Sequence, residues 1–343
     1  MAVKQIFEHN NILITGGAGF IGSHLCESLV RDNKIICIDN LSTGSEKNID
    51  FLLRHPNFEF INHDITKPIN LEDLPELEKF KVRWQGIQEI YHLACPASPS
   101  KFDDIGIDVL LSSSEGTRAT LDMAVQYNAK YMYLSSSVVY GHAVSGTEIK
   151  EDYIGKVDQL GPKNCYIEGK RFAESLIDNY RKKHNLDTKI IRAFTTYGPR
   201  MGIDDGRLIS TFVSQAMDNK DLVIKGDQNA RNSFCYIDDL IEGMLRVMGT
   251  SNNNPINIGN PEDLPIIEVA KKVLSSTDSK SQIVFKERGK GEQISHIPSI
   301  DYAKENLGWE PIVLIDTGLK KTMDYLKASR SLLGFSDGGV RKF

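Results

Sequence analysis

The sequence predicts an α/β fold, a doubly wound parallel sheet followed by a smaller C-terminal α/β lobe. Two observations support this prediction: short apolar runs alternate with helical patterns through residues 1–198, and a glycine-rich turn follows the first run. Beyond residue 198, glycine, proline and asparagine interrupt shorter elements. We therefore expect a sheet domain over residues 1–198, a smaller lobe over 199–330 and a flexible tail over 331–343.

The first apolar run and the turn after it predict a dinucleotide site. The run covers residues 11–15, Gly16, Gly19 and Gly22 follow it, and a helical pattern covers residues 23–31. Glycines at these positions allow a tight turn and let a pyrophosphate approach the backbone, while the helix N-terminus supplies N–H donors. The order of strand, glycine turn and helix is typical of a Rossmann domain.

The end of the second strand indicates which dinucleotide is bound. Residues 34–38 form another apolar run, which ends in Asp39, 23 residues after Gly16. An acid at this place can bind the ribose hydroxyls of NAD, and its charge would repel the 2′-phosphate of NADP. The alternative is an acid that only caps a helix or closes a turn. We expect NAD as the cofactor.

The remaining elements continue the alternation. It favours a parallel sheet with helices on both faces. The predicted strands cover 58–62, 89–94, 131–135 and 189–193, and the helices between or after them cover 103–127 and 167–184. In the smaller lobe we expect helices over 209–217, 238–248 and 266–274 and a strand over 222–225.

Composition excludes several classes of protein. The chain has 343 residues, of which 40% are hydrophobic and 25% charged, and its net charge of −5 gives no basic field for nucleic acid or an anionic membrane. We expect no run long enough to span a membrane, and no signal peptide. The five cysteines are scattered singly, without the spacing of a metal site, which favours a cytoplasmic protein with no metal.

A tyrosine and a lysine at the start of a predicted helix form a candidate proton-transfer pair. Tyr166 and Lys170 are four residues apart, so on a helix they lie on one face. An adjacent ammonium favours the phenolate and brings a phenol closer to use as a base at neutral pH. Such a pair also occurs by chance on many helix surfaces, so it gains meaning only from its context.

Several motifs together resemble the extended short-chain dehydrogenase/reductase family, and within it the nucleotide-sugar epimerases, dehydratases and decarboxylases. The resemblance covers roughly residues 10–328. The matching motifs are TGGAGFIG at 15–22, DN at 39–40, YHLA at 91–94, LSSSVVYG at 134–141, Tyr166 with Lys170, YGP at 197–199 and LGWEP at 307–311. The segments HLACPASP at 92–99, CYIEGKR at 165–171, YGPRM at 197–201 and DGR at 205–207 are most similar to the UDP-glucuronate decarboxylase (UDP-xylose synthase) branch.

The resemblance implies a role for each matching residue. NAD would oxidise the sugar at C4, Tyr166 would take the hydroxyl proton, Lys170 would hold the ribose and lower the pKa of the tyrosine, and Ser136 would bind the C4 oxygen. The implied cofactor contacts are Gly16, Gly19, Phe20, Ile21, Gly22, Asp39, Asn40, Asp64, Ile65, Leu93 and Ala94 with Tyr166 and Lys170. The implied substrate contacts are Ser137, Val138, Thr195, Arg200, Arg207 and Arg231. The nucleotide sugar would bind mainly in the lobe over 199–330, and the helices over 103–127 and 167–184 would form a homodimer.

The chain departs from the family pattern where the substrate is contacted. Val138 stands where the decarboxylases carry a glutamate and, with Ser137, leaves out the acid that dehydratases use. Thr195 and Ser113 replace asparagines, while Asn232 and His296 replace arginines. Losing a guanidinium that binds a carboxylate or diphosphate changes substrate preference. Arg231 could take over from the missing arginine, although a shift of one residue in a strand normally reverses the side chain. The remaining candidate anion contacts are Arg192, Arg200, Arg207, Arg231 and Arg288.

These observations leave more than one function open. The first is NAD-dependent, UDP-glucuronate-decarboxylase-like modification of a nucleotide sugar. A 4-epimerase or C4 oxidoreductase needs only Tyr166, Lys170, Ser136 and NAD, and a 4,6-dehydratase is weaker because its acid is missing. A non-catalytic, NAD-binding regulatory protein is the alternative of another class. We expect His92 to pack beside the cofactor, and Cys95 and Cys165 to be small packing residues.

Overall fold

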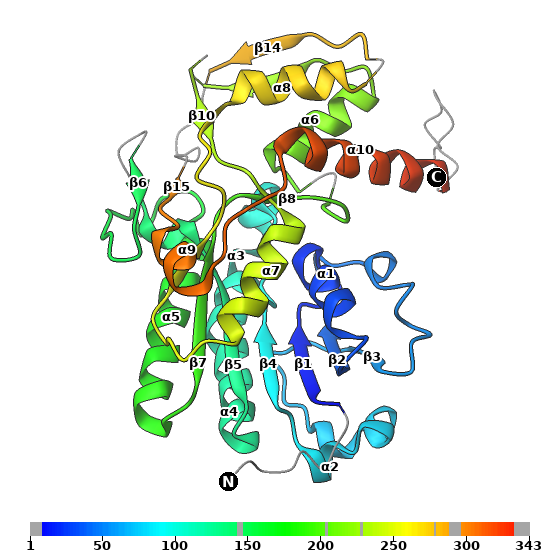
Figure 1. The fold of residues 1–343 in the computed structure, drawn as a ribbon, viewed down its shortest axis with the longest axis vertical. Helices are drawn as coiled ribbons and strands as arrows, with labels where there is room; N and C mark the ends of the chain where they lie inside the picture. The colour runs from blue at the N-terminus through cyan, green and yellow to red at the C-terminus, as the bar shows by residue number, and fades with distance from the viewer. Residues whose placement is uncertain are drawn as a thin grey trace.

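A seven-stranded parallel sheet forms the centre of the molecule (Figure 1). The computed structural model describes residues 9–142, 147–202, 205–226, 229–277, 279–287 and 296–332. From one edge to the other the strands are β3 (Phe58–Asn62), β2 (Lys34–Asp39), β1 (Asn11–Thr15), β4 (Glu89–His92), β5 (Lys130–Ser136), β7 (Thr188–Ala193) and β12 (Ile256–Ile258). This order, with the first strand inside the sheet, is the doubly wound order, so the predicted fold class is confirmed.

The strands alternate their side chains between two apolar cores. Ile12 and Ile14 of β1 belong to one core, whereas Leu13 between them belongs to the other. Every residue of β1 is buried, as expected for a strand covered on both faces. The apolar run that identified this strand in the sequence is therefore a consequence of its double burial.

Helices cover both faces of the sheet. Leu25 of α1 and Leu240 of α7 contribute to the core that contains Ile12, while Leu121 of α4 and Ile177 of α5 contribute to the other core. The helices are α1 (Phe20–Leu29), α2 (Val82–Gln85), α3 (Phe102–Leu111), α4 (Thr117–Tyr127), α5 (Asn164–His184) and α7 (Ile237–Met248). The helix predicted over 103–127 is α3 and α4 joined by one π-helical turn, Ser112–Gly116.

A smaller group of elements lies over the carboxyl ends of the strands (Figure 1). It consists of short paired strands and helices: β6 (Glu148–Ile149) with β15 (Ile297–Pro298), β8 (Thr196–Tyr197) with β11 (Cys235–Tyr236), β9 (Leu222–Lys225) with β14 (Ile283–Lys286), β10 (Arg231–Asn232) with β13 (Leu264–Pro265), and α6 (Leu208–Met217), α8 (Ile266–Ser275), α9 (Asp301–Leu307) and α10 (Ile315–Leu332). The predicted helices and strand of this region correspond to α6, α7, α8 and β9.

The chain returns to the central sheet after it has begun the smaller lobe. β12 pairs with β7, and α7 packs beside α1, although both belong to the second predicted segment. The sheet therefore does not end at residue 198. That the segment after this residue binds most of the substrate stays a prediction. α10 continues to Leu332, so it includes the first two residues of the predicted tail, and 333–343 lie outside the described residues.

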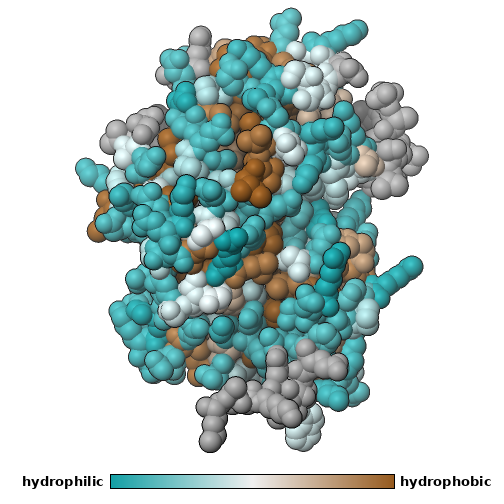
Figure 2. All heavy atoms as spheres, viewed as in Figure 1, coloured by the Kyte–Doolittle hydropathy of each residue, from teal (hydrophilic) through white to brown (hydrophobic). Residues whose placement is uncertain are grey.

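The surface of the molecule contrasts with its apolar core. The face shown in Figure 2 is mostly hydrophilic, and the hydrophobic atoms that reach it gather toward its middle. In the described part of the chain, no helix combines the length and the apolar character needed to cross a membrane.

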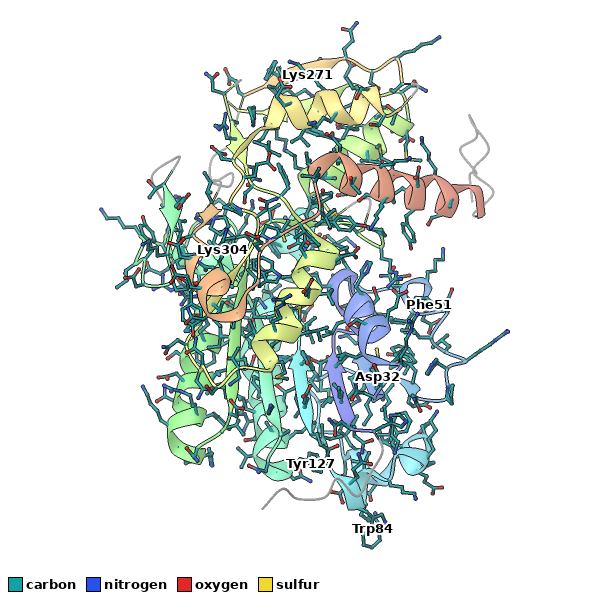
Figure 3. The ribbon with its side chains drawn as sticks, in the orientation of Figure 1. Asp32, Phe51, Trp84, Tyr127, Lys271 and Lys304 are labelled. Atoms are coloured by element: carbon teal, nitrogen blue, oxygen red, sulfur yellow. The ribbon has the colours of Figure 1, made fainter. Side chains whose placement is uncertain are left out.

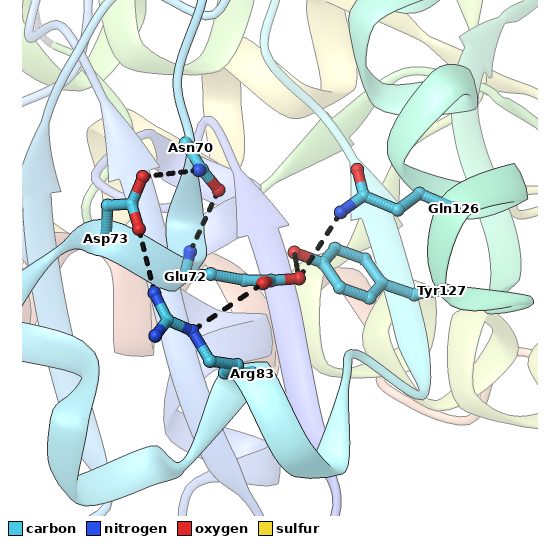
Figure 4. Close-up of polar contacts among 6 residues, drawn as sticks. All are labelled: Asn70, Glu72, Asp73, Arg83, Gln126 and Tyr127. Carbon is cyan, nitrogen blue, oxygen red and sulfur yellow. Dashed lines mark hydrogen bonds and ion pairs between the residues drawn. The ribbon is translucent and has the colours of Figure 1, made fainter.

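A polar cluster ties the end of α4 to the region around α2 (Figure 4). Tyr127 donates a hydrogen bond of 3.4 Å to Glu72, and Arg83 contacts Asp73 at 2.9 Å. Burial and the neighbouring Glu72 carboxylate raise the pKa of Tyr127 to about 12. Figure 3 places Tyr127 and the exposed Trp84 at the end of the sheet away from the smaller lobe, so this cluster holds the scaffold and not the site described below.

Candidate active site

A cleft of about 2010 Å³ opens at the carboxyl ends of the strands, beneath the smaller lobe. It exceeds the roughly 300–1,000 Å³ of a site for one drug-sized ligand, so it has room for a dinucleotide and a second ligand. Every residue predicted to bind the cofactor or the substrate, and all three predicted catalytic residues, line this cleft. The structure thus brings the predicted residues together, while their individual roles remain predictions.

The glycine turn after β1 leaves no room for side chains. A Cβ on Gly16, whose φ is +74°, would lie 2.8 Å from the backbone nitrogen of Ala94, and a Cβ on Gly22 would lie 2.1 Å from the Gly16 carbonyl oxygen. α1 begins at Phe20, and its N-cap Gly19 provides no side-chain cap. The first N–H groups of α1 thus remain available for a phosphate, as a pyrophosphate site requires.

Asp39 stands at the end of β2 with its carboxylate already oriented. The carboxylate accepts hydrogen bonds from the backbone N–H of Ala18 at 3.0 Å and of Leu41 at 2.8 Å. Burial raises the pKa of Asp39, and the backbone hydrogen bonds oppose that rise. These bonds fix an acidic group beside the glycine turn, which is the arrangement expected for binding the ribose of NAD.

Asp64 and Ile65, two of the predicted cofactor contacts, have different surroundings in the structure. Asp64 accepts hydrogen bonds from the backbone and the hydroxyl of Thr66, at 2.9 and 2.8 Å, and so closes a turn. Ile65 is buried in the wall of the cleft, where it would meet a Cβ placed on Gly116 at 3.1 Å. The turn thus presents Ile65 as an apolar surface to the cleft.

The lysine of the candidate pair is held by the sheet. α5 begins at Asn164, so Tyr166 and Lys170 lie in its first two turns. The Lys170 ammonium donates a hydrogen bond of 2.7 Å to the Leu134 carbonyl, and it lies 4.5 Å from the Tyr133 ring centroid and 5.8 Å from that of Tyr166. Burial lowers the pKa of Lys170. The lysine is thereby a fixed donor at the end of β5.

The tyrosine of the pair is buried, which shifts its pKa upward. Burial first, and the neighbouring Cys95 second, raise the pKa of Tyr166 to about 12, whereas its hydrogen bond with Ser136 and the charge of Arg207 lower it. That Lys170 also lowers this pKa stays a prediction. The Tyr166 ring also stacks on Phe102 of α3, with 5.4 Å between the ring centroids.

Phe102 was not predicted near the site, and Cys95 was expected only as a small packing residue. Phe102 lines the cleft and covers one face of the tyrosine, and Cys95 lines the cleft with its thiol 3.9 Å from the Ser113 hydroxyl. A stacking partner 64 residues away in the chain has no local signal in the sequence. Cys95 lies in the HLACPASP segment, so position in the motif could have indicated it.

The arginines predicted to contact the substrate already have carboxylate partners. Arg200 pairs with Glu27 at 2.5 Å, and Arg231 pairs with Asp263 at 2.6 Å. Arg207 lies 3.4 Å from a carboxylate oxygen of Asp205, and it donates to the Ala97 carbonyl at 3.2 Å. Arg207 is thus the least tightly held of the three, and its charge reaches Tyr166.

Arg192 lies outside the cleft. Its guanidinium binds Glu174 through two hydrogen bonds, of 3.0 and 2.7 Å, and Glu174 also accepts the Ser135 hydroxyl at 2.6 Å. This network supports the strand end that carries Ser136. Arg192 is therefore a structural residue and not a free anion contact, while Arg288 lies outside the described residues.

The substituted positions divide into those that face the cleft and those behind it. Val138, Thr195, Asn232 and His296 line the cleft. Ser113 is buried behind it, at the place where a Cβ on Gly169 would lie 2.8 Å from its hydroxyl oxygen.

His92 is buried beside the cleft without lining it. The hydroxyls of Thr15 and Thr117 flank its ring nitrogens at 2.7 and 3.2 Å. Burial lowers the pKa of His92 to about 3, so the ring is neutral. This arrangement fits the predicted packing role.

Comparison with known proteins gives the family. The model of the NAD dependent epimerase/dehydratase family matches residues 12–259. UDP-glucuronic acid decarboxylase 6 of Arabidopsis thaliana is 39% identical over 92% of this chain and 89% of its own length. UDP-glucuronic acid decarboxylase 1 of Danio rerio is 37% identical over 93% of this chain and 73% of its own.

Solved structures show the same fold. UDP-glucuronic acid 4-epimerase from Bacillus cereus, in complex with UDP-glucuronic acid and NAD, superposes with a TM-score of 0.81 at 28% identity, over 93% of this chain and 99% of its own. UDP-glucose 4-epimerase from Thermotoga maritima, with UDP-glucose, gives a TM-score of 0.81 at 26% identity, over the same 93% and 99%. The chain belongs to the NAD-dependent epimerase/dehydratase family.

Proposed function

We propose that this enzyme oxidises a nucleotide sugar transiently at C4, with UDP-glucuronate as the substrate and decarboxylation as the outcome. The observation that carries the proposal is the convergence of Tyr166, Lys170 and Ser136 on one cleft beside the glycine turn. The similarity to the UDP-glucuronic acid decarboxylases supports the choice of substrate. The neighbouring lobe, residues 199–330, would hold most of the nucleotide sugar.

The residues present fit NAD. The glycine turn and the start of α1 suit the pyrophosphate, Asp39 suits the ribose hydroxyls, and Lys170 suits the second ribose. A buried carboxylate at Asp39 would repel the 2′-phosphate of NADP. When bound, the oxidised nicotinamide accepts a hydride, and its positive charge favours the phenolate of Tyr166.

The side chains then have distinct tasks. Tyr166 takes the proton of the C4 hydroxyl, Ser136 donates a hydrogen bond to the same oxygen, and Lys170 keeps a positive charge near the phenolate. In a 4-keto uronate, the bond from C5 to the carboxylate breaks, CO2 leaves, and the electron pair moves into the ketone to give an enolate. Protonation of C5 and reduction of the ketone complete the reaction.

A 4-epimerase or C4 oxidoreductase is the second candidate. Val138 favours it, because the cleft offers a valine where the decarboxylase pattern has a glutamate. The similarity in fold to UDP-glucuronic acid 4-epimerase supports it as well. A 4,6-dehydratase lacks its acid at Ser137 and Val138, and a non-catalytic NAD-binding protein would not need Tyr166 and Lys170 in place.

Turnover of UDP-glucuronate tests the proposal. We expect UDP-xylose and CO2 from the wild type, and a fall in kcat of about 10²–10⁴-fold in Tyr166→Phe, because the phenol supplies the proton transfer. NMR of the sugar and mass spectrometry follow the product. Tyr180→Phe is the matched control, since Tyr180 lies on the same helix and donates to Asp122 at the surface.

Each alternative predicts a different product. A C4 epimer of UDP-glucuronate without loss of CO2 would replace the decarboxylase by the epimerase. Failure of every tested nucleotide sugar to reduce bound NAD in the wild type would favour the non-catalytic protein.

We also propose a cytoplasmic homodimer built on α3 and α5. These helices pack against each other and expose apolar side chains, namely Ile107, Leu110 and Leu111 of α3 and Phe172 of α5. Ile107, Leu110 and Leu111 follow the spacing of one helix face. The five cysteines are all free thiols, which suits a reducing compartment. Nucleic acid and membranes are not expected as partners.

A further inference from the structure

His296, in the wall of the cleft, has an unusual hydrogen-bond arrangement. The residue lines the cleft and is only 7% exposed. Its Nε2 lies 2.7 Å from the Gly141 carbonyl oxygen. Its Nδ1 is buried and has no hydrogen-bond partner within the described structure. A buried polar atom without a partner is uncommon in folded proteins.

The contact with Gly141 decides which nitrogen carries the proton. A carbonyl oxygen can only accept a hydrogen bond, so Nε2 must be the donor. In the neutral ring Nδ1 is then an acceptor with a free lone pair. The ring is neutral, because burial and the nearby His142 lower the pKa of His296 more than the Gly141 contact raises it.

An acceptor selects against anions. Phosphate and carboxylate oxygens also carry lone pairs, so neither forms a hydrogen bond with a neutral Nδ1. A sugar hydroxyl or the N–H of a base can donate to it. Arg200 and Arg231, which line the same cleft, form ion pairs with Glu27 and Asp263.

We propose that His296 is a specificity-determining residue, whose Nδ1 accepts a hydrogen bond either from a hydroxyl of the hexose or from an N–H of the base in the bound nucleotide sugar. This inference rests on the proposed function, since it assumes a nucleotide sugar in the cleft. It adds that the group placed against His296 is a neutral donor.

Binding measurements with four ligands test this inference. Calorimetry would compare UDP-glucose, UDP, CDP and UDP-glucuronate on NAD-loaded protein, with Tyr166→Phe present throughout so that no ligand reacts. His296→Phe keeps a ring and removes the acceptor. We expect His296→Phe to lower the affinity for the ligand that carries the donor by about tenfold, which is the effect of losing one buried hydrogen bond.

The ligand pairs identify the donor. If a sugar hydroxyl donates, His296→Phe narrows the affinity ratio between UDP-glucose and UDP. If the uracil N–H donates, it narrows the ratio between UDP and CDP, because cytosine has no hydrogen at that nitrogen. His296→Arg should strengthen UDP-glucuronate relative to UDP-glucose. His184→Phe, at the exposed end of α5, is the control and should change none of the ratios.

The outcomes separate the two proposals. A merely structural role through Gly141 would weaken all four ligands equally, and equal weakening or unchanged affinities would overturn the inference. Thermal unfolding shows whether each variant is folded. Absence of binding of every ligand to the protein with His296 intact would overturn the proposed function, and this inference with it.

Discussion

At the scale of single residues, burial and the groups around the phenol shift the pKa of Tyr166. The sequence indicates Tyr166 and Lys170 through their spacing, and the structure places both in the cleft. The pKa of the tyrosine was not predictable, because it depends on burial and on Ser136 and Arg207, which come from distant parts of the chain. Arg207 thus acts on the phenol through its charge.

Arg207→Gln should move the pH dependence of the reaction. A positive charge stabilises the phenolate and lowers the pKa of Tyr166, so removing it raises that pKa. The rise of kcat/KM with pH, which follows formation of the phenolate, should therefore shift to higher pH. Rate measurements across pH with UDP-glucuronate check this. Arg83→Gln removes an equal charge far from the cleft and should leave the profile in place, and a profile unmoved in Arg207→Gln would contradict the argument.

Departures from the family pattern identify residues of the cleft, but they do not reveal the partners of those residues. Val138, Asn232 and His296 were singled out because they break a pattern, and all three line the cleft. Ser113 breaks the pattern too, yet it is buried behind the cleft. Arg231 was a candidate replacement for a lost arginine, but Asp263 binds it at an exposed position. Partners of this kind come from tertiary packing, which a motif does not contain.

At the scale of elements, the glycine turn is the part that tolerates least change. Gly22→Ala would place a Cβ 2.1 Å from the Gly16 carbonyl, and only a shift of α1 away from β1 could relieve this contact. We expect NAD affinity to fall by at least about tenfold, because the N-terminus of α1 would no longer be in position. Calorimetric titration with NAD measures it.

Gly249→Ala is the matched control for that change. A Cβ on Gly249 would have its nearest contact at 3.4 Å, and the residue follows α7 with an ordinary φ of −76°. Its NAD affinity should equal that of the wild type. If Gly249→Ala lost as much NAD affinity as Gly22→Ala, the close approach at Gly22 would not be the cause of the loss.

The length and the burial of an element decide whether it can be predicted from the sequence. The strands β1, β2 and β3 were predicted within one residue of their bounds. For β1 and β2 the reason is that strands covered on both faces are nearly continuous apolar runs. β12 was missed, since three residues are too few for a pattern, and its pairing with β7 is set by tertiary contact. α10 was missed because its polar residues obscure the apolar face formed by Leu319, Met323 and Leu326.

At the scale of the whole molecule, the cleft results from the way the chain crosses between its parts. β12 and α7 return to the sheet between elements of the smaller lobe, so the lobe is attached by several connections and lies over the strand ends. Alternation in the sequence predicts the sheet, but not this return. The cleft therefore joins residues from the beginning, the middle and the last third of the chain.

The proposed dimer depends on apolar side chains that two adjacent helices expose at the surface of the molecule. Ile107 is 75% exposed on α3, and Phe172 is 52% exposed on the adjacent α5. Burying such side chains against a second copy removes apolar surface from water, at about 1.5–3 kcal/mol for each side chain. In a two-fold symmetric dimer each side chain counts twice, so Ile107→Asp should weaken association by on the order of 10²–10⁴-fold. Light scattering at micromolar concentration should then show a dimer for the wild type and a monomer for the variant. Trp84→Glu, which changes an 81% exposed side chain on α2, should remain dimeric, and a wild type that is monomeric at this concentration would exclude the α3 and α5 interface.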